Sequence, residues 1–330
     1  MLKIAIVGMG DVATHHYLPF LRDQGDVELG LHSRDQEKAR RLAEAFGAKH
    51  FSTIDDLAGW NPTATLVLTS EKVRYEIAWA LIEAGVKRIF CEKPLVAAKG
   101  QAHVSEDDFC RGRRLLAFAR ESQCEMAMNF NYRFFDQTLL AKEIARSRCF
   151  GSVIQVAMLT HYACWSHCID LLHFFAGKCM EITGLSGGVE RHGQGIEACD
   201  RAAAFRMESG AVGTLIGTSG LKWRHPLFEA IFTFESGRIH MRDIDGDLEV
   251  LDGASHTHER ISRGRDASRW DDYGSSFKKA LSAYLTSLKA GTQPPVPGVD
   301  GLRELQFEAA LGRSVMENRP VDVQGEFPLF

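Results

Sequence analysis

The chain opens with the stretch LKIAIVGMGDVA, residues Leu2–Ala13. Its first half, Leu2–Val7, is a short apolar run typical of a parallel strand that is covered on both faces. The second half fits the pattern GxGxxA: Gly8 makes a tight turn, Gly10 lets the backbone approach a pyrophosphate, and Ala13 lets helix and strand pack closely. The N-terminus of the following helix would offer free N–H groups to the phosphates. The stretch therefore predicts a dinucleotide-binding turn, and the weaker alternative is a structural glycine turn without a ligand.

Strand and helix patterns alternate after this turn. Further strands are expected at Val27–His32, Thr65–Thr69 and Val86–Cys91. Helices are expected at about residues 12–24, 35–46, 74–84 and 105–122, and Ser105–Asp108 has the form of a capping box. This order, with short connections, predicts a parallel, doubly wound α/β sheet with right-handed crossovers. We expect a dinucleotide-binding Rossmann domain at residues 1–124.

The pattern changes near Cys124. Strands are expected at 125–130 and 152–159, with helices at 136–147 and 166–175. Several short strands follow, and the sequence Glu-Ser-Gly at 208–210 and again at 235–237 is typical of hairpin turns. Two helices, at 271–290 and 301–318, are expected at the end. This order predicts an α+β domain at residues 125–330, built on a mostly antiparallel sheet.

Composition excludes several classes of protein. The chain has 330 residues, of which 45% are hydrophobic, as expected of a folded protein of about two domains. Its 39 Lys and Arg against 43 Asp and Glu give a net charge of −4 without long runs, so we expect no nucleic-acid partner. No stretch reaches the roughly 18 apolar residues of a membrane span. The N-terminus has no pattern of a secretory leader, so we expect a cytoplasmic protein.

The end of the second predicted strand bears on the choice of cofactor. An acidic residue that binds the ribose of NAD is usual there, and this chain has Ser33 followed by Arg34. A hydroxyl and a planar cation would instead favour a 2′-phosphate, so we expect NADP(H) to be preferred and NAD(H) to be possible. Two alternatives stay open. Ser33 could only cap the next helix, with Arg34 solvated, or Asp35 could reach the ribose.

The fourth predicted strand ends in Glu92-Lys93-Pro94. Together with the terminal GxGxxA pattern, this motif resembles the glucose–fructose oxidoreductase / inositol dehydrogenase family. The resemblance runs through the whole chain and includes Thr69, the segment Asn129–Phe134 and the segment His167–Leu172. It implies hydride transfer to or from a hydroxyl or carbonyl group of a sugar, a polyol or a related small molecule. It also implies that the C-terminal domain, with an open sheet, binds substrate and forms a homodimer or homotetramer through that sheet.

The resemblance also implies roles for single residues. The family's catalytic lysine and histidine match Lys93 and His167. Both residue types suit the reaction, since a buried lysine with a lowered pKa and a histidine can each move a proton. Alternatively, Lys93 is a solvated residue at a strand end and His167 a packed one. Glu92 would pair with Lys93 or touch the nicotinamide end of the cofactor. The expected cofactor-binding set is Gly8, Gly10, Asp11, Val12, Ser33, Arg34, Thr69, Glu92 and Lys93.

The sequence departs from the family pattern before His167. Many members have an aspartate four residues earlier, where this chain has Ala163 and lacks a glycine-rich loop. Tyr162 or His161 could then supply a hydrogen bond, or the site could serve a different substrate. Asp170 either orients His167 or pairs with a nearby cation.

Arg133 is the other candidate for a substrate contact. It either binds a substrate or forms a salt bridge at the domain junction. The candidate substrate residues are accordingly Arg133, Tyr162 and Asp170.

Several functions stay open at this point. The leading hypothesis is an NADP(H)-dependent oxidoreductase; imine reduction, a non-catalytic dinucleotide sensor and a glycosidase with a retained cofactor are alternatives. His161, Cys164, His167 and Cys168 have helical spacings, but four ligands from one helix cannot surround Zn²⁺, so we expect no metal. The aromatic residues Trp165, Trp223 and Tyr273 could line a pocket but are more often core residues.

Overall fold

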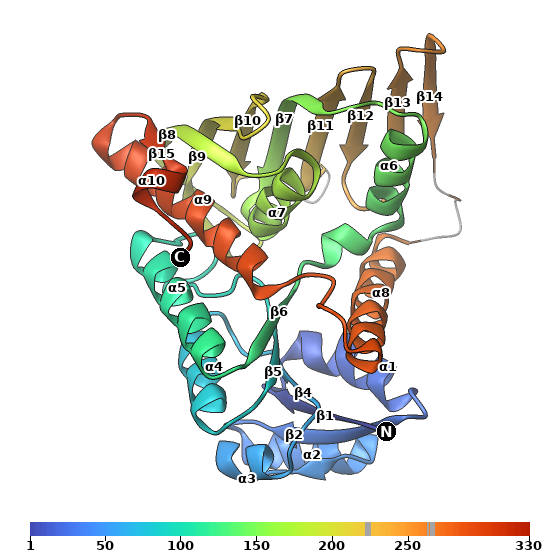
Figure 1. Ribbon diagram of the computed structural model, residues 1–330, viewed down its shortest axis with the longest axis vertical. Coiled ribbons are helices and arrows are strands. Elements are labelled where there is room, and N and C mark those ends of the chain that lie inside the picture. Colours follow the sequence, from blue (N-terminus) through green and yellow to red (C-terminus); the bar gives the residue numbers. More distant parts are fainter. Residues whose placement is uncertain (222–225, 263, 265–267) are drawn as a thin grey trace.

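The computed structural model of the protein describes residues 1–221, 226–262, 264 and 268–330, so Trp223 lies outside the described residues. Two sheets organise the fold, one with six strands and one with nine. Figure 1 shows the nine-stranded sheet above the six-stranded one, with α8 and α9 in the space between them. The fold is α/β, as the sequence predicts.

The first sheet is parallel throughout and has the order β3-β2-β1-β4-β5-β6. Its strands are β1 (Leu2–Val7), β2 (Val27–His32), β3 (Lys49–His50), β4 (Ala64–Val67), β5 (Arg88–Glu92) and β6 (Glu125–Asn129). The doubly wound sheet is therefore confirmed. The two-residue strand β3 was not predicted. The strand that follows the predicted domain boundary, β6, is the sixth strand of this sheet, while the boundary itself stays a prediction.

The helices of this half lie where the patterns predict, with two exceptions. They are η1 (Ala13–Tyr17), α1 (Leu18–Arg22), α2 (Gln36–Phe46), α3 (Ile54–Gly59), α4 (Arg74–Glu83) and α5 (Glu106–Glu121). The predicted first helix contains a π-helical segment, η1, which is a feature often found at functional sites. The short α3 was not predicted. The capping box at Ser105 and Asp108 is confirmed, because each side chain bonds the backbone of the other residue.

The second sheet has the order β14-β13-β12-β11-β7-β10-β9-β8-β15. Only the pair β7–β10 is parallel, so the prediction of a mostly antiparallel sheet is confirmed. The strands are β7 (Val153–His161), β8 (Cys179–Gly193), β9 (Ile196–Met207), β10 (Val212–Thr218), β11 (Phe228–Phe234), β12 (Gly237–Arg242), β13 (Leu248–Asp252), β14 (Thr257–Ile261) and β15 (Val321–Asp322). Both Glu-Ser-Gly segments join antiparallel strands, as predicted.

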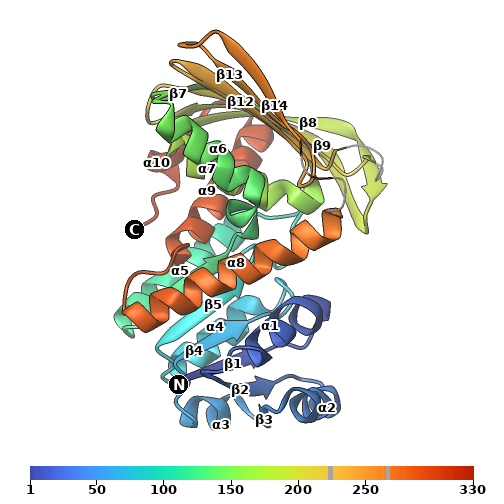
Figure 2. The ribbon, with the colours of Figure 1, turned by 90° about the vertical axis from the view of Figure 1, so that its right-hand side faces the viewer.

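The helices of the second half lie on one side of this sheet. They are η2 (Asn131–Phe134), α6 (Asp136–Ser147), η3 (Tyr162–Cys164), α7 (Trp165–Ala176), α8 (Arg269–Ala290), α9 (Gly298–Glu317) and α10 (Val323–Glu326). Figure 2 shows the sheet across the top of the molecule with these helices below it. Within the described part of the chain, no helix combines the length and apolar character that a bilayer crossing requires.

Helices α8 and α9 return to the first sheet. Phe277 and Tyr284 of α8 join the buried cluster that contains Ile4 of β1 and Phe90 of β5, and the Tyr284 and Phe90 rings are 4.7 Å apart. Helix α9 packs against α5, where a Cβ atom on Gly112 would lie 2.8 Å from Leu305. The two halves of the chain therefore share buried contacts.

Candidate active site

A cleft opens where β1, β2 and β4 end, at the carboxyl edge of the first sheet. It has a volume of about 650 Å³. Five of the nine predicted cofactor-binding residues line it, namely Gly8, Gly10, Ser33, Arg34 and Thr69. Crevices outside the carboxyl ends of parallel strands are where doubly wound sheets bind ligands. The structure thus brings the glycine turn and the end of the second strand to one site.

The two glycines of the turn have different geometry. Gly8 has a φ of +99°, and a Cβ atom there would lie 2.8 Å from the backbone nitrogen of Thr69. A Cβ atom on Gly10 would have no described atom within 4 Å. Gly8 therefore lets two strand ends approach each other, while Gly10 leaves its backbone uncovered beside the cleft. That open space fits the pyrophosphate of a dinucleotide. The predicted residues Asp11 and Val12 follow Gly10 at the start of the first helix and do not line the cleft.

Several cationic side chains line the cleft. The carboxylate of Asp35 accepts a hydrogen bond from the backbone N–H of Lys38 at 3.0 Å, so Asp35, and not Ser33, caps α2. Arg34, Lys38 and Lys72 line the cleft, and within the described residues none of the three forms an ion pair. Sequence analysis missed Lys38 and Lys72. The alternative in which Ser33 serves as the helix cap is wrong.

Lys93 follows β5 and is partly buried. Its Nζ donates to Oε1 of Gln101 at 2.8 Å and to the carbonyl oxygen of Ala163 at 3.3 Å. Burial lowers the pKa of Lys93 below its usual value. An ammonium group has three donors, so one remains for a ligand in the described structure. Position 163, where the family's aspartate would stand, therefore does lie beside Lys93, but it contributes only a backbone oxygen.

The carboxylate of Glu92 accepts hydrogen bonds from groups other than the ammonium group of Lys93. It accepts from the hydroxyl of Tyr17 at 2.5 Å, from Nδ2 of Asn129 at 2.8 Å and from the backbone N–H of Lys93 at 3.3 Å. Tyr17 ends η1 and Asn129 ends β6. The interpretation that Glu92 pairs with the Lys93 side chain is therefore wrong. Neither Glu92 nor Lys93 lines the 650 Å³ cleft.

Arg74 connects two loops of the site. Its guanidinium group is buried and donates to the carbonyl oxygens of Thr69, at 2.7 Å, and Pro94. One side chain at the start of α4 thereby fixes the segments that follow β4 and β5. Nothing in the local sequence pattern distinguishes this arginine from a solvated one, and sequence analysis missed it.

His167 lies on the first turn of α7 and is 3% exposed. Its ring stacks on Tyr132, with centroids 3.9 Å apart and an interplanar angle of 2°. Nδ1 has no hydrogen-bond partner among the described residues. Burial, and then the charge of Lys93, lowers the pKa of His167 well below its usual value. The imidazole is therefore neutral, within electrostatic reach of Lys93, and able to accept or donate one hydrogen bond more.

The predicted substrate residues are engaged with other protein groups. Arg133 forms an ion pair with Asp170, with Nε–Oδ2 and Nη2–Oδ1 distances of 2.8 and 2.5 Å, and a second one with Asp300 at 2.9 Å. Asp170 therefore pairs with a cation, which was one of its two interpretations. The hydroxyl of Tyr162 donates to the carbonyl oxygen of Cys199 at 2.8 Å. A substrate role for these residues stays a prediction.

Both ring nitrogens of His161 form hydrogen bonds with backbone groups. Its Nδ1 accepts from the N–H of Ala163 at 3.0 Å, and its Nε2 donates to the carbonyl oxygen of Ser219 at 3.1 Å. Cys164 lies against Tyr132, with Sγ 3.1 Å from the hydroxyl, and Cys168 donates to Thr160 at 3.3 Å. In the described part of the chain, no three His, Cys, Asp or Glu residues are arranged to hold a metal ion.

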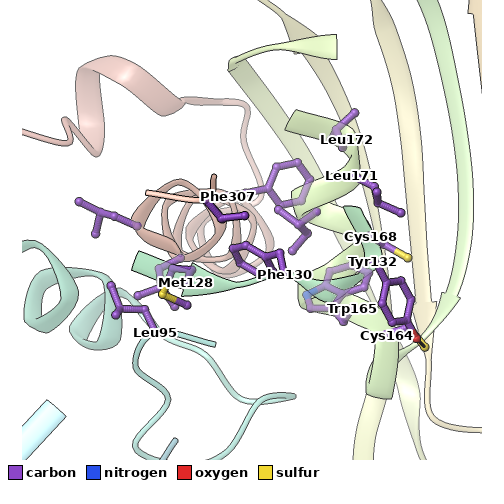
Figure 3. Packing of buried hydrophobic residues seen from close by; sticks show 14 of the residues in the cluster. Leu95, Met128, Phe130, Tyr132, Cys164, Trp165, Cys168, Leu171, Leu172 and Phe307 are labelled. Atoms are coloured by element: carbon purple, nitrogen blue, oxygen red, sulfur yellow. Dashed lines mark hydrogen bonds between the residues drawn. The ribbon is translucent and has the colours of Figure 1, made fainter. Parts of the chain in front are cut away.

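One apolar cluster contains residues that neighbour Lys93 and His167 in the chain. Figure 3 shows Trp165 and Cys168 of α7, Phe130 and Met128 near β6, Phe307 of α9 and Leu95 around a common interior. Trp165 is thus a core residue, and Tyr273 packs against this cluster as well. Leu95 lies two residues after Lys93, so the segment that carries the lysine is anchored in this interior.

Comparisons with known proteins agree with this geometry. Residues 2–130 match the model of an oxidoreductase family with an NAD-binding Rossmann fold. The described residues thus combine a Rossmann fold with a second, mixed sheet. Residues 2–130 are thus similar to the oxidoreductase family that the two motifs of this segment indicate.

Individual relatives are distant. The chain is 24% identical over 157 residues to glucose-6-phosphate 3-dehydrogenase of Bacillus subtilis, a match that covers 47% of this chain and 41% of that protein. It is 27% identical over 157 residues to D-glucoside 3-dehydrogenase of Escherichia coli, covering 46% and 41%. The chain thus spans about two fifths of these curated relatives.

A solved structure extends the likeness to the whole fold. An oxidoreductase from Agrobacterium radiobacter, in complex with NAD⁺, L-tartaric acid and magnesium, superposes with a TM-score of 0.81. The alignment covers 98% of this chain and 99% of that one at 16% sequence identity. At this identity, the likeness shows the fold alone.

Proposed function

We propose that the chain is an NADP(H)-dependent oxidoreductase that moves a hydride to or from a hydroxyl or carbonyl group of a sugar- or polyol-like substrate. The observation that carries the proposal is Lys93, a partly buried lysine with a lowered pKa and a free donor. It follows β5, in the sheet whose neighbouring strand ends form the dinucleotide cleft. The two dehydrogenases that act on glucose-6-phosphate and D-glucosides support the substrate class.

The residues of the chain would divide the work as follows. Gly8, Gly10 and Thr69 would bind the pyrophosphate part of the dinucleotide, with Asp11 and Val12 at the N-terminus of the helix. When bound, the cofactor supplies or accepts the hydride. Lys93 would exchange a proton with the substrate oxygen, and His167 would be the second proton carrier. Glu92, held by Tyr17 and Asn129, would set the position of Lys93 from the preceding residue.

Turnover tests the enzyme assignment directly. Purified protein with NADP⁺ should reduce the cofactor in the presence of hexoses, glucosides or polyols, and Lys93→Met should abolish turnover while it leaves cofactor affinity largely intact. A fully active Lys93→Met variant would remove the lysine from the mechanism. Denaturation of the purified protein shows whether a dinucleotide is already bound to it. If none is released and the protein binds neither cofactor, the whole proposal is overturned.

The preference for NADP(H) rests on the cations of the cleft. A 2′-phosphate carries up to two negative charges, and Arg34, Lys38 and Lys72 are the side chains placed to meet them, with the hydroxyl of Ser33. Titration with NADPH and with NADH should show tighter binding of NADPH. Arg34→Ala should weaken NADPH binding several-fold and leave NADH binding nearly unchanged. Arg40→Ala, at an exposed position of α2, is the matched control. Equal losses for both cofactors would refute the phosphate contact.

We also propose that a second copy of the chain covers the open face of the nine-stranded sheet, giving a homodimer or homotetramer. The register places Leu185, Ala202, Ile216 and Leu159 in one row across β8, β9, β10 and β7. Leu185 is 67% exposed, Leu159 51% and Ile216 42%. An apolar row of this kind is typical of an association surface. Light scattering should give a multiple of 36.7 kDa, and Leu159→Lys with Ile216→Lys should reduce it, whereas Met316→Lys, at an exposed position of α9, should not. A monomeric wild type would overturn the proposal.

A further inference from the structure

A turn that follows the Glu-Lys-Pro motif brings a second side chain to Lys93. Gln101 lies eight residues after the lysine, and its Oε1 accepts a hydrogen bond from Nζ of Lys93 at 2.8 Å. No other hydrogen bond of the Gln101 side chain involves a described residue. The side chain of this glutamine therefore serves the lysine and not the turn that carries it.

The turn is held independently of the Gln101 side chain. The N–H of Gly100 donates to the carbonyl oxygen of Ala97 at 3.0 Å, and the N–H of His103 donates to that of Gly100 at 2.9 Å. Ala102, next to Gln101, is 5% exposed and belongs to the apolar cluster of which Figure 3 shows a part. Backbone hydrogen bonds and packing thus fix the turn, and a change of the Gln101 side chain removes neither.

The second acceptor of Lys93 is fixed as well. Nζ also donates to the carbonyl oxygen of Ala163 at 3.3 Å. The N–H of Ala163 donates to Nδ1 of His161 at 3.0 Å, and Nε2 of His161 donates to the carbonyl oxygen of Ser219 at 3.1 Å. A buried imidazole therefore holds the residue whose carbonyl oxygen meets the lysine.

Two fixed acceptors leave the nitrogen of Lys93 one free direction. An ammonium group has three N–H donors, and a neutral amine has two N–H groups and one lone pair. When two N–H groups donate to Gln101 and Ala163, the remaining position of the tetrahedral nitrogen has a single direction, whether it holds the lone pair or a proton. Both acceptors are neutral oxygen atoms, so neither adds a negative charge that would keep the lysine protonated.

We propose that Gln101 is a positioning residue, which together with the carbonyl oxygen of Ala163 directs the free position of the Lys93 nitrogen toward the substrate oxygen. The proposal rests on the proposed function. In alcohol oxidation, the substrate hydroxyl gives its proton to the lone pair of Nζ, and Lys93 ends as an ammonium group. The O–H electron pair becomes the second C=O bond as the C–H electron pair leaves as hydride to the oxidised nicotinamide cofactor. Carbonyl reduction runs in reverse.

Turnover of two variants tests the proposal. Gln101→Met keeps the length of the side chain and removes the acceptor, and we expect kcat to fall at least about tenfold with little change in KM or in affinity for NADPH. Gln101→Glu restores an acceptor and should recover most of kcat at high pH. His103→Met, at an exposed position of the same turn, is the control. Thermal unfolding shows whether each variant is folded. A folded Gln101→Met variant with unchanged kcat overturns the proposal.

Gln101→Glu also adds a charge beside the lysine. In alcohol oxidation only the neutral amine can accept the proton, so kcat rises as the pH passes through the pKa of Lys93. The added carboxylate favours the ammonium form, so this rise should move to a pH about one unit higher. His103→Glu adds the same charge at the exposed position and should not move it. The other ionisable groups that interact with the charge of Lys93 stay unchanged in both variants, namely Glu71, Glu92, Cys164, His167 and Glu304.

A third measurement needs no substrate. The pKa of Lys93 is followed by NMR in cofactor-free protein with ¹³C-labelled lysine, and Lys93→Met assigns the signal. Gln101→Glu should raise this pKa by about one unit, whereas His103→Glu should leave it unchanged. An unchanged value in Gln101→Glu overturns the proposal even if no substrate is found. A raised value in a protein that shows no turnover supports the contact between Gln101 and Lys93 and places the failure in the proposed function.

Discussion

The two glycines of the dinucleotide turn should respond to the same substitution in opposite ways. In Gly8→Ala, the residue must keep a φ of +99° and its Cβ atom meets the backbone nitrogen of Thr69 at 2.8 Å. The left-handed backbone costs about 1–2 kcal/mol, and the displacement of a neighbouring backbone adds about 1–3 kcal/mol. We therefore expect Gly8→Ala to lower the free energy of unfolding by about 2–5 kcal/mol.

Gly10→Ala should leave the stability of the fold unchanged and weaken cofactor binding. Its added methyl group meets no described atom within 4 Å, so the free energy of unfolding should change by less than about 0.5 kcal/mol. The same methyl group would occupy the space that we assign to the pyrophosphate. Affinity for NADPH should fall at least about tenfold, which corresponds to about 1.4 kcal/mol.

Urea unfolding and a fluorescence titration with NADPH measure both quantities, and each variant is the control of the other. If Gly8→Ala were as stable as the wild type, the close approach of β1 and β4 would not require glycine. If Gly10→Ala bound NADPH with unchanged affinity, the cofactor would not occupy the open space beside Gly10.

Three further changes test other parts of the structure. Arg74→Met should lower the free energy of unfolding by about 2–4 kcal/mol, because two carbonyl oxygens lose a charged donor, and turnover should fall as the Lys93 segment loosens; urea unfolding and kcat measure this. Burial, opposed by the charge of Arg133, raises the pKa of Asp170 to about 6. Protonation of Asp170 therefore stabilises the folded protein at a pH below the pKa that Asp170 has in the unfolded chain, and this stabilisation is lost as the pH rises through about 6. Asp170→Asn should therefore be more stable relative to wild type at pH 8 than at pH 5, and an equal difference at both would refute this. Asp108→Ala should cost about 2 kcal/mol, since its buried carboxylate accepts from the backbone N–H groups of Ala98 and Ser105, and thermal unfolding checks it.

Much of the fold follows from local patterns. The strands β1, β2, β4 and β5 are apolar runs ended by glycine or polar residues, and such runs are read from a few neighbouring residues. The strand β3 has only two residues, one of them exposed, so it has no pattern of its own. The membership of β6 in the first sheet depends on its pairing with β5. No local signal determines that pairing, which is why the strand was expected in the second half.

The candidate site likewise contains residues that local motifs identify and residues that only long-range packing places. Gly8, Gly10 and Lys93 stand in short motifs whose chemistry is local, so sequence analysis found them. At the end of β2, Ser33 and Asp35 are both good helix caps, and only the register of α2 selects Asp35. The partners of Glu92 come from positions 75 and 37 residues away in the chain. Contacts of this range arise from packing, and no sequence window contains them.

The return of α8 to the first sheet affects how the protein can be made. During synthesis from the N-terminus, β1 leaves the ribosome about 270 residues and β5 nearly 200 residues before Phe277 and Tyr284, which complete their buried cluster. Until then the nascent chain presents an apolar patch on its Rossmann half, of the kind that chaperones bind. A gene cut after residue 130 would leave that patch permanently open, so the nucleotide-binding half is expected to aggregate when it is expressed alone.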